Sequence, residues 1–370
     1  MTQKHNSKRA RDLGLPMPGT PGPQNAITDV EGVLVGYETL SSRLTPALAS
    51  NGLPVQTGVT AILPRGRTST PRPVWAGLHA LNGNGEMTGS HWVKDAGYFT
   101  GPILITNTHS VGAAHEAAVR WMVDTYRDAW ENNHLWAMPV VAETYDGVLN
   151  DINGLHVRPE HAAKALENAT SNPPAEGNVG GGAGMICYEF KGGTGTASRR
   201  IEAGGKPHTV GVLVQANHGL RPWFKVLGQS VGEKMMEDRL PSFKAERGSI
   251  IVIIATDLPL LPSQLDRLAR RATIGIGRGG TPGGNSSGDI FLAFSTANEM
   301  NLPQLSGPWK SMVSLNDDLL DPVYMAAVEA IEEAVLNAML AAEDTPTARP
   351  AGAVCRAIDA EALKELFAQG

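Results

Sequence analysis

The chain has 370 residues, of which 42% are hydrophobic and 18% charged, and its formal net charge is −6 at pH 7. This length and apolar content can fill a large buried core, which excludes a disordered protein. The acidic balance argues against binding to a phosphate backbone, so we expect no nucleic-acid partner.

Sequence signals for a membrane, an oxidising compartment or a metal are sparse. No run of about 18 apolar residues occurs, so we expect no spanning helix and no membrane partner. Cys187 and Cys355 are too few for a disulfide framework, which indicates a cytoplasmic protein. The histidines lack the i, i+4 spacing of a helical zinc motif, so we expect no metal and no other cofactor.

A Pro- and Gly-rich lead covers residues 1–24, which we expect to be extended, and a single folded domain is expected over residues 25–370. Apolar runs of strand length then follow along the chain. They cover residues 32–40, 59–63, 102–106, 137–143, 185–190, 210–215, 250–256 and 290–295. Because these runs are apolar at nearly every position, we expect strands that are covered on both faces.

Helical patterns separate these strands. The two longest begin after Ser110 and Pro322, and a shorter one covers residues 263–272. The order of strands and helices lacks the regular alternation of a doubly wound sheet. Two stacked sheets with helices outside would cover each strand on both faces, so we predict an α/β fold with four α/β/β/α layers.

Two glycine-rich stretches, "NVGGGAGM" and "GIGRGGTPGGNSSGD", invite comparison with phosphate-binding loops. Neither has the Lys and Ser/Thr ending of a P-loop or the context of a dinucleotide fingerprint. We interpret their glycines as turn and close-approach residues. Residues 169–184, which include the first stretch, are expected to form a loop that is a linker, a site wall or a subunit contact.

The pair Gly248 and Ser249 stands immediately before the apolar run in "ERGSIIVIIATD". One interpretation is a turn, because Gly tolerates positive φ and Ser bonds its own backbone. The other is chemical. A serine that becomes the first residue of a new chain carries its own base, since a free α-amine has a reference pKa of about 7.7 to 8.0. Attack of the Ser249 hydroxyl on the Gly248 carbonyl, followed by hydrolysis of the ester, would produce that residue.

Seven segments resemble, in order, the DmpA family of self-processing aminopeptidases. They are "LNGNGEMTGSHWVKDAG", "GPILITNTHSVG", "AETYDGVLNDINGLHV", "GGAGMICYEFKGGTGTASR", "VGVLVQANHG", "GSIIVIIATD" and "SSGDIFLAFSTAN". The resemblance runs from Arg11 to Ala341. It implies a serine aminopeptidase that releases N-terminal residues from small peptides, amino acid amides or esters. Both L-aminopeptidase/D-esterases and β-peptidyl aminopeptidases belong to this family.

The resemblance also implies a processing site and an assembly. Cleavage between Gly248 and Ser249 would give an α chain of residues 1–248 and a β chain of residues 249–370. The implied fold is the four-layer sandwich that the family shares with ornithine acetyltransferases, which is similar to N-terminal-nucleophile hydrolases but differently connected. The implied assembly is a tetramer of α/β pairs, and no metal or organic cofactor is implied.

By the same resemblance, Ser249 matches the nucleophile, and Ser287 and Asp289 match the pair that hydrogen-bonds and orients it. Asn217 and Tyr145 match oxyanion-site residues, and both side chains are donors suited to a developing alkoxide. Glu143 would share a strand face with Tyr145 if that strand is regular, and is expected to receive the ammonium group of the substrate.

The sequence leaves the substrate preference and two alternative functions open. Some β-peptide-cleaving members of the family carry Glu at the position of Asp289, so Asp289 favours the L-aminopeptidase/D-esterase branch. One alternative is a self-processing N-acyltransferase of the ornithine acetyltransferase type, although that type normally has Thr where this chain has Ser249. The other is a non-catalytic protein that binds small molecules through its glycine-rich loops, and it predicts an uncut chain.

Overall fold

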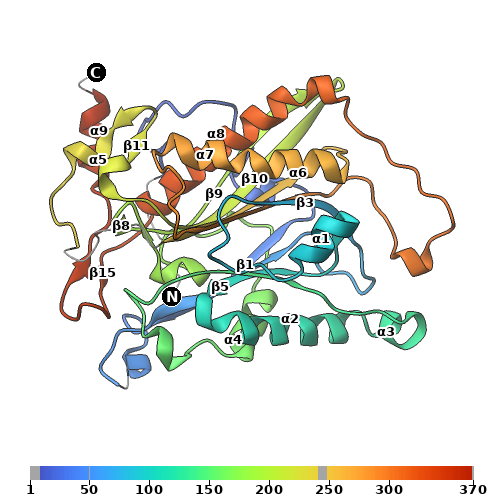
Figure 1. Ribbon diagram of the computed structural model, residues 1–370, viewed down its shortest axis with the longest axis horizontal. Helices are drawn as coiled ribbons and strands as arrows, with labels where there is room; N and C mark the ends of the chain where they lie inside the picture. The colour runs from blue at the N-terminus through green and yellow to red at the C-terminus, as the bar shows by residue number, and fades with distance from the viewer. Residues whose placement is uncertain (1–8, 50, 241–247, 369–370) are drawn as a thin grey trace.

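The computed structural model describes residues 9–49, 51–240 and 248–368. Two β-sheets lie stacked between two layers of helices (Figure 1). The larger sheet has the strand order β4 (Tyr98–Phe99), β3 (Val74–Ala80), β14 (Gly288–Ser295), β13 (Ser249–Thr256), β10 (Lys206–Asn217) and β9 (Gly193–Ala203). The smaller sheet has the order β1 (Leu34–Ser41), β2 (Gln56–Leu63), β5 (Ile103–Asn107) and β6 (Val140–Thr144). The predicted four-layer sandwich is confirmed.

The outer layers are formed by helices from distant parts of the chain. α6 (Pro262–Arg270), α7 (Ala272–Arg278) and α8 (Asp321–Leu340) cover the larger sheet, and α2 (Val111–Thr125) and α4 (Pro159–Glu167) cover the smaller one. The remaining elements are short: α1 (Ser90–Ala96), α3 (Arg127–Asn133), α5 (Val231–Lys234), α9 (Ala360–Ala368), and the strand pairs β7 (Ile186–Cys187) with β8 (Phe190–Lys191), β11 (Lys225–Val226) with β12 (Gln229–Ser230), and β15 (Thr345–Pro346) with β16 (Val354–Cys355). No helix among the described residues has the length and apolar character needed to traverse a bilayer.

The central strand β13 shows why nearly every residue of its run is apolar. Its alternate residues Ile250, Val252 and Ile254 pack beneath the helices of the larger sheet. The residues between them, Ile251 and Ile253, pack in the core between the two sheets. Successive side chains of a strand point to opposite faces, so both faces of β13 are buried, as the sequence predicts.

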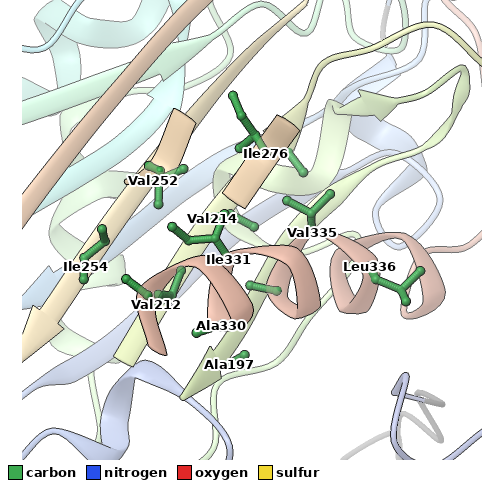
Figure 2. Close-up of a cluster of buried hydrophobic side chains, with 14 of the residues drawn as sticks. Ala197, Val212, Val214, Val252, Ile254, Ile276, Ala330, Ile331, Val335 and Leu336 are labelled. Carbon is green, nitrogen blue, oxygen red and sulfur yellow. The ribbon is translucent and has the colours of Figure 1, made fainter. Parts of the chain in front are cut away.

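The helix-side core is a close contact between α7, α8 and the strands beneath them. Figure 2 shows Ile276 of α7 and Ile331 of α8 in one cluster with Val212, Val214 and Val252 of the larger sheet. Gly275, one residue before Ile276 in α7, is buried against α8. A Cβ added there would lie 2.7 Å from Cβ of Ile331. The absence of a side chain at Gly275 therefore sets how closely α7 approaches α8.

Two sequence predictions for single elements are wrong. The predicted strand over residues 185–190 is a tight hairpin, because Tyr188 and Glu189 adopt φ values of +50° and +62° between β7 and β8. The helical pattern after Ser110 is two helices, since the backbone leaves helical geometry at Tyr126. The sequence also failed to predict β3 and β9, which carry few consecutive large apolar residues.

The predicted loop over residues 169–184 contains a buried stretch of close backbone contacts. Gly180–Gly184 forms one 3-10 turn, and all five residues are buried. A Cβ on Gly182 would lie 2.2 Å from the Thr194 amide, and one on Gly184 would lie 2.3 Å from the Gln56 carbonyl. These glycines therefore serve close approach of backbone segments, as predicted, and not the cradling of a phosphate.

The N-terminal lead is packed against the body from residue 9 onward, while its residues 1–8 lie outside the described residues. Leu13, Leu15 and Met17 are buried in the same hydrophobic cluster as residues of α8. Arg11 Nε lies 3.0 Å from the buried carboxylate of Glu333 on that helix. Residues 9–24 thus pack against α8, which belongs to the domain that was predicted to begin at residue 25.

We expect alanine substitution at two glycines of α7 to change the stability of the protein in opposite directions. Gly275→Ala should lower the free energy of unfolding by about 1–3 kcal/mol, because the new methyl overlaps Ile331 and forces the helices apart. Gly277→Ala should raise it by up to about 1 kcal/mol, because a Cβ there meets no atom within 4 Å and alanine favours a helix. Urea unfolding of both variants tests this pair, and equal effects would contradict it.

Candidate active site

Ser249 is the first residue of β13 and lies between two strands of the larger sheet. It pairs with Asn217, the last residue of β10, on one side and with Gly288, the first residue of β14, on the other. Its side chain is buried, and its Oγ accepts a hydrogen bond of 3.0 Å from the Gly288 amide. Alternate residues of a strand point to the same face, so the Ser249 side chain lies on the face of Ile251 and Ile253, between the two sheets.

The residue before Ser249 has no room for a side chain. A Cβ on Gly248 would lie 1.7 Å from the carbonyl oxygen of Asn217 and 3.0 Å from Cα of His218. Neither atom can move far, since both belong to the backbone at the end of β10. A glycine is therefore required for β13 to start in this register.

Ser287 and Asp289 form a hydrogen-bonded pair at the start of β14. Ser287 Oγ donates to Asp289 Oδ1 at 2.6 Å, and Asn82 Nδ2 donates to Asp289 Oδ2 at 3.1 Å. Both members of the pair are buried. Burial raises the pKa of Asp289, against hydrogen bonds from Ser287, Asn82 and the Ile250 amide that favour its ionised form.

Asn217 is held in one orientation by two backbone groups. Its Oδ1 accepts from the Ile186 amide at 2.8 Å, and its Nδ2 donates to the Tyr145 carbonyl at 3.0 Å. A side-chain amide has two N–H donors, so the contact with Tyr145 occupies one of them. The structure thus brings Ser249, Asn217, Ser287 and Asp289 to one end of the larger sheet.

Tyr145 lies just beyond β6, which ends at Thr144. Tyr145 is 40% exposed, whereas Glu143 is buried. The two residues therefore do not share a face of a regular strand, because the strand ends one residue before Tyr145. The phenol folds back over the next turn, because a Cβ on Gly147 would lie 2.3 Å from Tyr145 Oη. The group of Tyr145 that contacts another predicted site residue is its carbonyl, which accepts a hydrogen bond from Asn217 Nδ2.

Glu143 and the start of β14 lie on two sides of the loop that contains Gly85. A Cβ on Gly85 would lie 3.3 Å from both Glu143 Oε1 and Cα of Gly288. The carboxylate accepts hydrogen bonds from the Glu86 amide, at 2.9 Å, and from the Thr108 hydroxyl. Burial raises the pKa of Glu143, and the nearby carboxylate of Glu86 raises it further.

Asp146, which follows Tyr145, anchors the turn after β6. It is buried, its Oδ1 accepts from Asn150 Nδ2 at 3.0 Å, and its carbonyl accepts from the amides of Leu149 and Asn150. Burial raises the pKa of Asp146 to about 7. This residue therefore fixes the path of the chain that presents the Tyr145 carbonyl.

Sequence reasoning missed several groups that complete this arrangement. They are the Gly288 amide, Asn82, Ile186, Thr108 and Asp146. Each lies inside a segment that carries the family resemblance. Each acts, however, through a backbone amide or through a contact with another side chain, and no sequence pattern marks such a role. Among residues 9–49, 51–240 and 248–368, no group of three or more His, Cys, Asp or Glu side chains is arranged to hold a metal.

Comparison with known proteins gives a family match over most of the chain. The model of peptidase family S58 matches residues 25–351. Beta-peptidyl aminopeptidase BapA of Sphingosinicella microcystinivorans is 53% identical over 348 residues, which cover 90% of this chain and 86% of that protein. The beta-peptidyl aminopeptidase BapA of Sphingosinicella xenopeptidilytica is 43% identical, with 90% and 85% covered.

Solved structures with the same fold include a serine aminopeptidase. The L-aminopeptidase D-Ala-esterase/amidase of Ochrobactrum anthropi, a variant of the Ntn hydrolase fold, is 55% identical, superposes with a TM-score of 0.92, and is covered to 98% in both chains. A beta-aminopeptidase of Burkholderia sp. is 46% identical with a TM-score of 0.87 and the same coverage.

Proposed function

This chain belongs to peptidase family S58, the DmpA family predicted from its motifs, and we propose that it is a self-processing serine aminopeptidase with Ser249 as its nucleophile. One observation carries the choice of nucleophile. A buried serine begins the central strand β13, directly after a glycine that has no room for a side chain and between Asn217 and Gly288. The proposed substrates are small peptides, amino acid amides and esters.

The first proposed reaction is cleavage of the chain itself. Ser249 Oγ attacks the carbonyl carbon of Gly248, the C–N bond between the two residues breaks, and an ester joins them while the nitrogen of Ser249 becomes a free amine. Water then hydrolyses the ester, which leaves a carboxylate on Gly248 and the hydroxyl on Ser249. The products are an α chain of residues 1–248 and a β chain of residues 249–370.

The second reaction uses the amine that the first one releases. The Ser249 hydroxyl attacks the carbonyl of the substrate, and its proton passes to the α-amine of the same residue. The oxyanion is stabilised by the free N–H of the Asn217 amide and by the Tyr145 hydroxyl. The C–N or C–O bond of the substrate then breaks, and the α-ammonium group returns its proton to the leaving amine or alcohol. Water hydrolyses the remaining ester of Ser249 and releases the acyl group. The hydrogen bonds that orient Asn217 support this role, because a donor must be fixed before charge develops.

Ser287 and Asp289 are proposed to act on the freed amine and not on Oγ. The parallel register pairs Ser249 with Gly288, so Asp289, one residue later, lies on the opposite face of the sheet from the Ser249 side chain. The backbone nitrogen of Ser249 lies in the plane of the sheet between them. The hydrogen bond from the Ile250 amide to the Asp289 carboxylate supports this geometry.

Glu143 is the proposed site for the ammonium group of the substrate. It is a buried carboxylate that accepts hydrogen bonds from a backbone amide and a hydroxyl. Because both donors are neutral, the negative charge of the ionised carboxylate is available to bind a cationic group. The similar proteins include both β-peptidyl aminopeptidases and an L-aminopeptidase D-Ala-esterase/amidase. We propose the latter specificity on the strength of Asp289, with β-peptides as the alternative substrate.

We further propose a cytoplasmic tetramer of α/β pairs, on the strength of the family resemblance and the absence of a disulfide framework in the sequence. Light scattering of the processed protein measures its mass, and a single α/β pair in solution would rule the tetramer out.

Self-cleavage predicts two fragments on a denaturing gel. The smaller fragment of the wild-type protein should begin Ser-Ile-Ile-Val by N-terminal sequencing. Ser249→Ala should give one full-length, inactive chain, whereas Ser263→Ala, an exposed position at the start of α6, should be cut normally. An uncut wild-type chain that hydrolyses aminoacyl amides would refute the mechanism. Acyl transfer to an added amine that far exceeds hydrolysis would favour the acyltransferase alternative.

The raised pKa of Glu143 predicts how substrate binding depends on pH. Protonation removes the charge that binds the ammonium group, so KM for an L-aminoacyl p-nitroanilide should rise as the pH falls through this raised pKa. Glu143→Gln should have a high KM without that rise. Glu116→Gln, on the exposed face of α2, should behave like the wild type. An unchanged pH profile in Glu143→Gln would remove Glu143 from the substrate site.

A further inference from the structure

The chain segment at residues 235–240, which precedes the proposed cleavage site, is docked onto the body by two arginines. Arg221 Nη1 donates to the carbonyls of Met235, at 3.2 Å, and Glu237, at 2.6 Å. Arg239, from the segment itself, makes a bidentate ion pair with Glu189, with Nε to Oε2 at 2.7 Å and Nη2 to Oε1 at 2.9 Å. Such paired contacts fix both position and orientation.

Glu189 is a turn residue in a conformation that its surroundings must maintain. It is buried, and with Tyr188 it forms the turn between β7 and β8 at positive φ. Non-glycine residues rarely adopt this region and persist there where other contacts enforce it. Its carboxylate accepts the two Arg239 donors and the Arg221 amide, and its carbonyl accepts from Arg221 Nη2 at 2.7 Å. Removal of Arg239 would therefore leave a buried carboxylate with one donor instead of three.

The same hairpin holds the proposed oxyanion donor. Ile186, at its start, donates its amide to Asn217 Oδ1 at 2.8 Å. Leu240, next to Arg239, is 4% exposed and belongs to one buried cluster with Ile186, Leu149 and Cys355. Leu149 lies in the turn after Tyr145, whose carbonyl accepts from Asn217 Nδ2 at 3.0 Å. Arg239 thus contacts the hairpin that contains Ile186, and Leu240 lies in one cluster with Ile186 and with Leu149 of the turn that follows Tyr145.

We propose that residues 235–240 position the Asn217 amide for the reaction, with Arg239 as a positioning residue that acts through Glu189 and the hairpin. This inference rests on the proposed function, in which Asn217 stabilises the oxyanion. These contacts are made by residues between Tyr145 and Leu240 and by Cys355, so none of them includes the Gly248–Ser249 bond that the proposed cleavage breaks. The end of the α chain is then a working part of the site formed with the β chain.

Arg239→Met tests the proposal in the processed enzyme. We expect kcat to fall roughly tenfold with KM little changed, because a misplaced oxyanion donor affects the transition state more than substrate binding. Asn217→Ala should cost more, about 10²-fold to 10³-fold, because it removes the donor. Arg120→Met breaks an exposed ion pair with Glu116 on α2 and is the matched control, with kcat unchanged.

The double variant Arg239→Met/Asn217→Ala separates positioning from general stability. If Arg239 acts through Asn217, the double variant should have the kcat of Asn217→Ala alone. A further tenfold loss in that background, or an unchanged kcat in Arg239→Met, would overturn the proposal. Where Asn217→Ala slows processing, the rate of self-cleavage on a gel replaces kcat in the same cycle.

Two further variants keep the test decisive. Arg239→Lys retains the charge but not the bidentate fork, so it should recover part of the lost kcat. Leu240→Ala replaces Arg239→Met if the latter fails to fold by circular dichroism, and should show the same dependence on Asn217. An uncut wild-type chain would refute the proposed function, whereas a cut, active enzyme whose kcat ignores Arg239 and Leu240 would refute only this inference.

Discussion

The site depends on the register of β13 between β10 and β14. A strand that slips by one residue turns every side chain to the opposite face. In β13 such a slip would move Ile251 and Ile253 out of the core between the sheets, together with Ser249, which shares their face. The hydrophobic core therefore fixes the position of the proposed nucleophile. The lack of space at Gly248 adds a second, local constraint at the same end of the strand.

Buried carboxylates around this register are held mainly by neutral donors. Asp289 is bonded by a hydroxyl and an amide, Glu143 by a hydroxyl and a backbone amide, and Asp146 by an amide. Burial raises the pKa of all three. Carboxylates without a cationic partner remain able to interact with one that arrives, such as the amine of Ser249 or of a substrate. The ion-paired carboxylate of Glu189, in contrast, serves the structure around the site.

Much of the architecture was predictable from the sequence, which also proposed candidate site residues that the structure brings to one end of the larger sheet. The two-sided burial of β13 follows from its unbroken apolar run, and the family segments identify Ser249, Asn217, Ser287 and Asp289. The hairpin of β7 and β8 was not predictable, because its residues 185–190 read as an apolar strand. Its turn has no glycine or asparagine at the positive-φ positions, and contacts with Arg221 and Arg239 enforce it instead.

The sequence by itself determined the layers, the family and the types of side chain available for chemistry, since apolar periodicity and motifs are local properties. Only the tertiary structure decided which groups meet. The Gly288 amide donates to Ser249, the Ile186 amide to Asn217, and Asn217 to the carbonyl of Tyr145, because strands of both sheets that are far apart in the chain begin or end close together. Backbone donors and acceptors are the same in every residue, so no sequence pattern marks the few that a fold brings to one place.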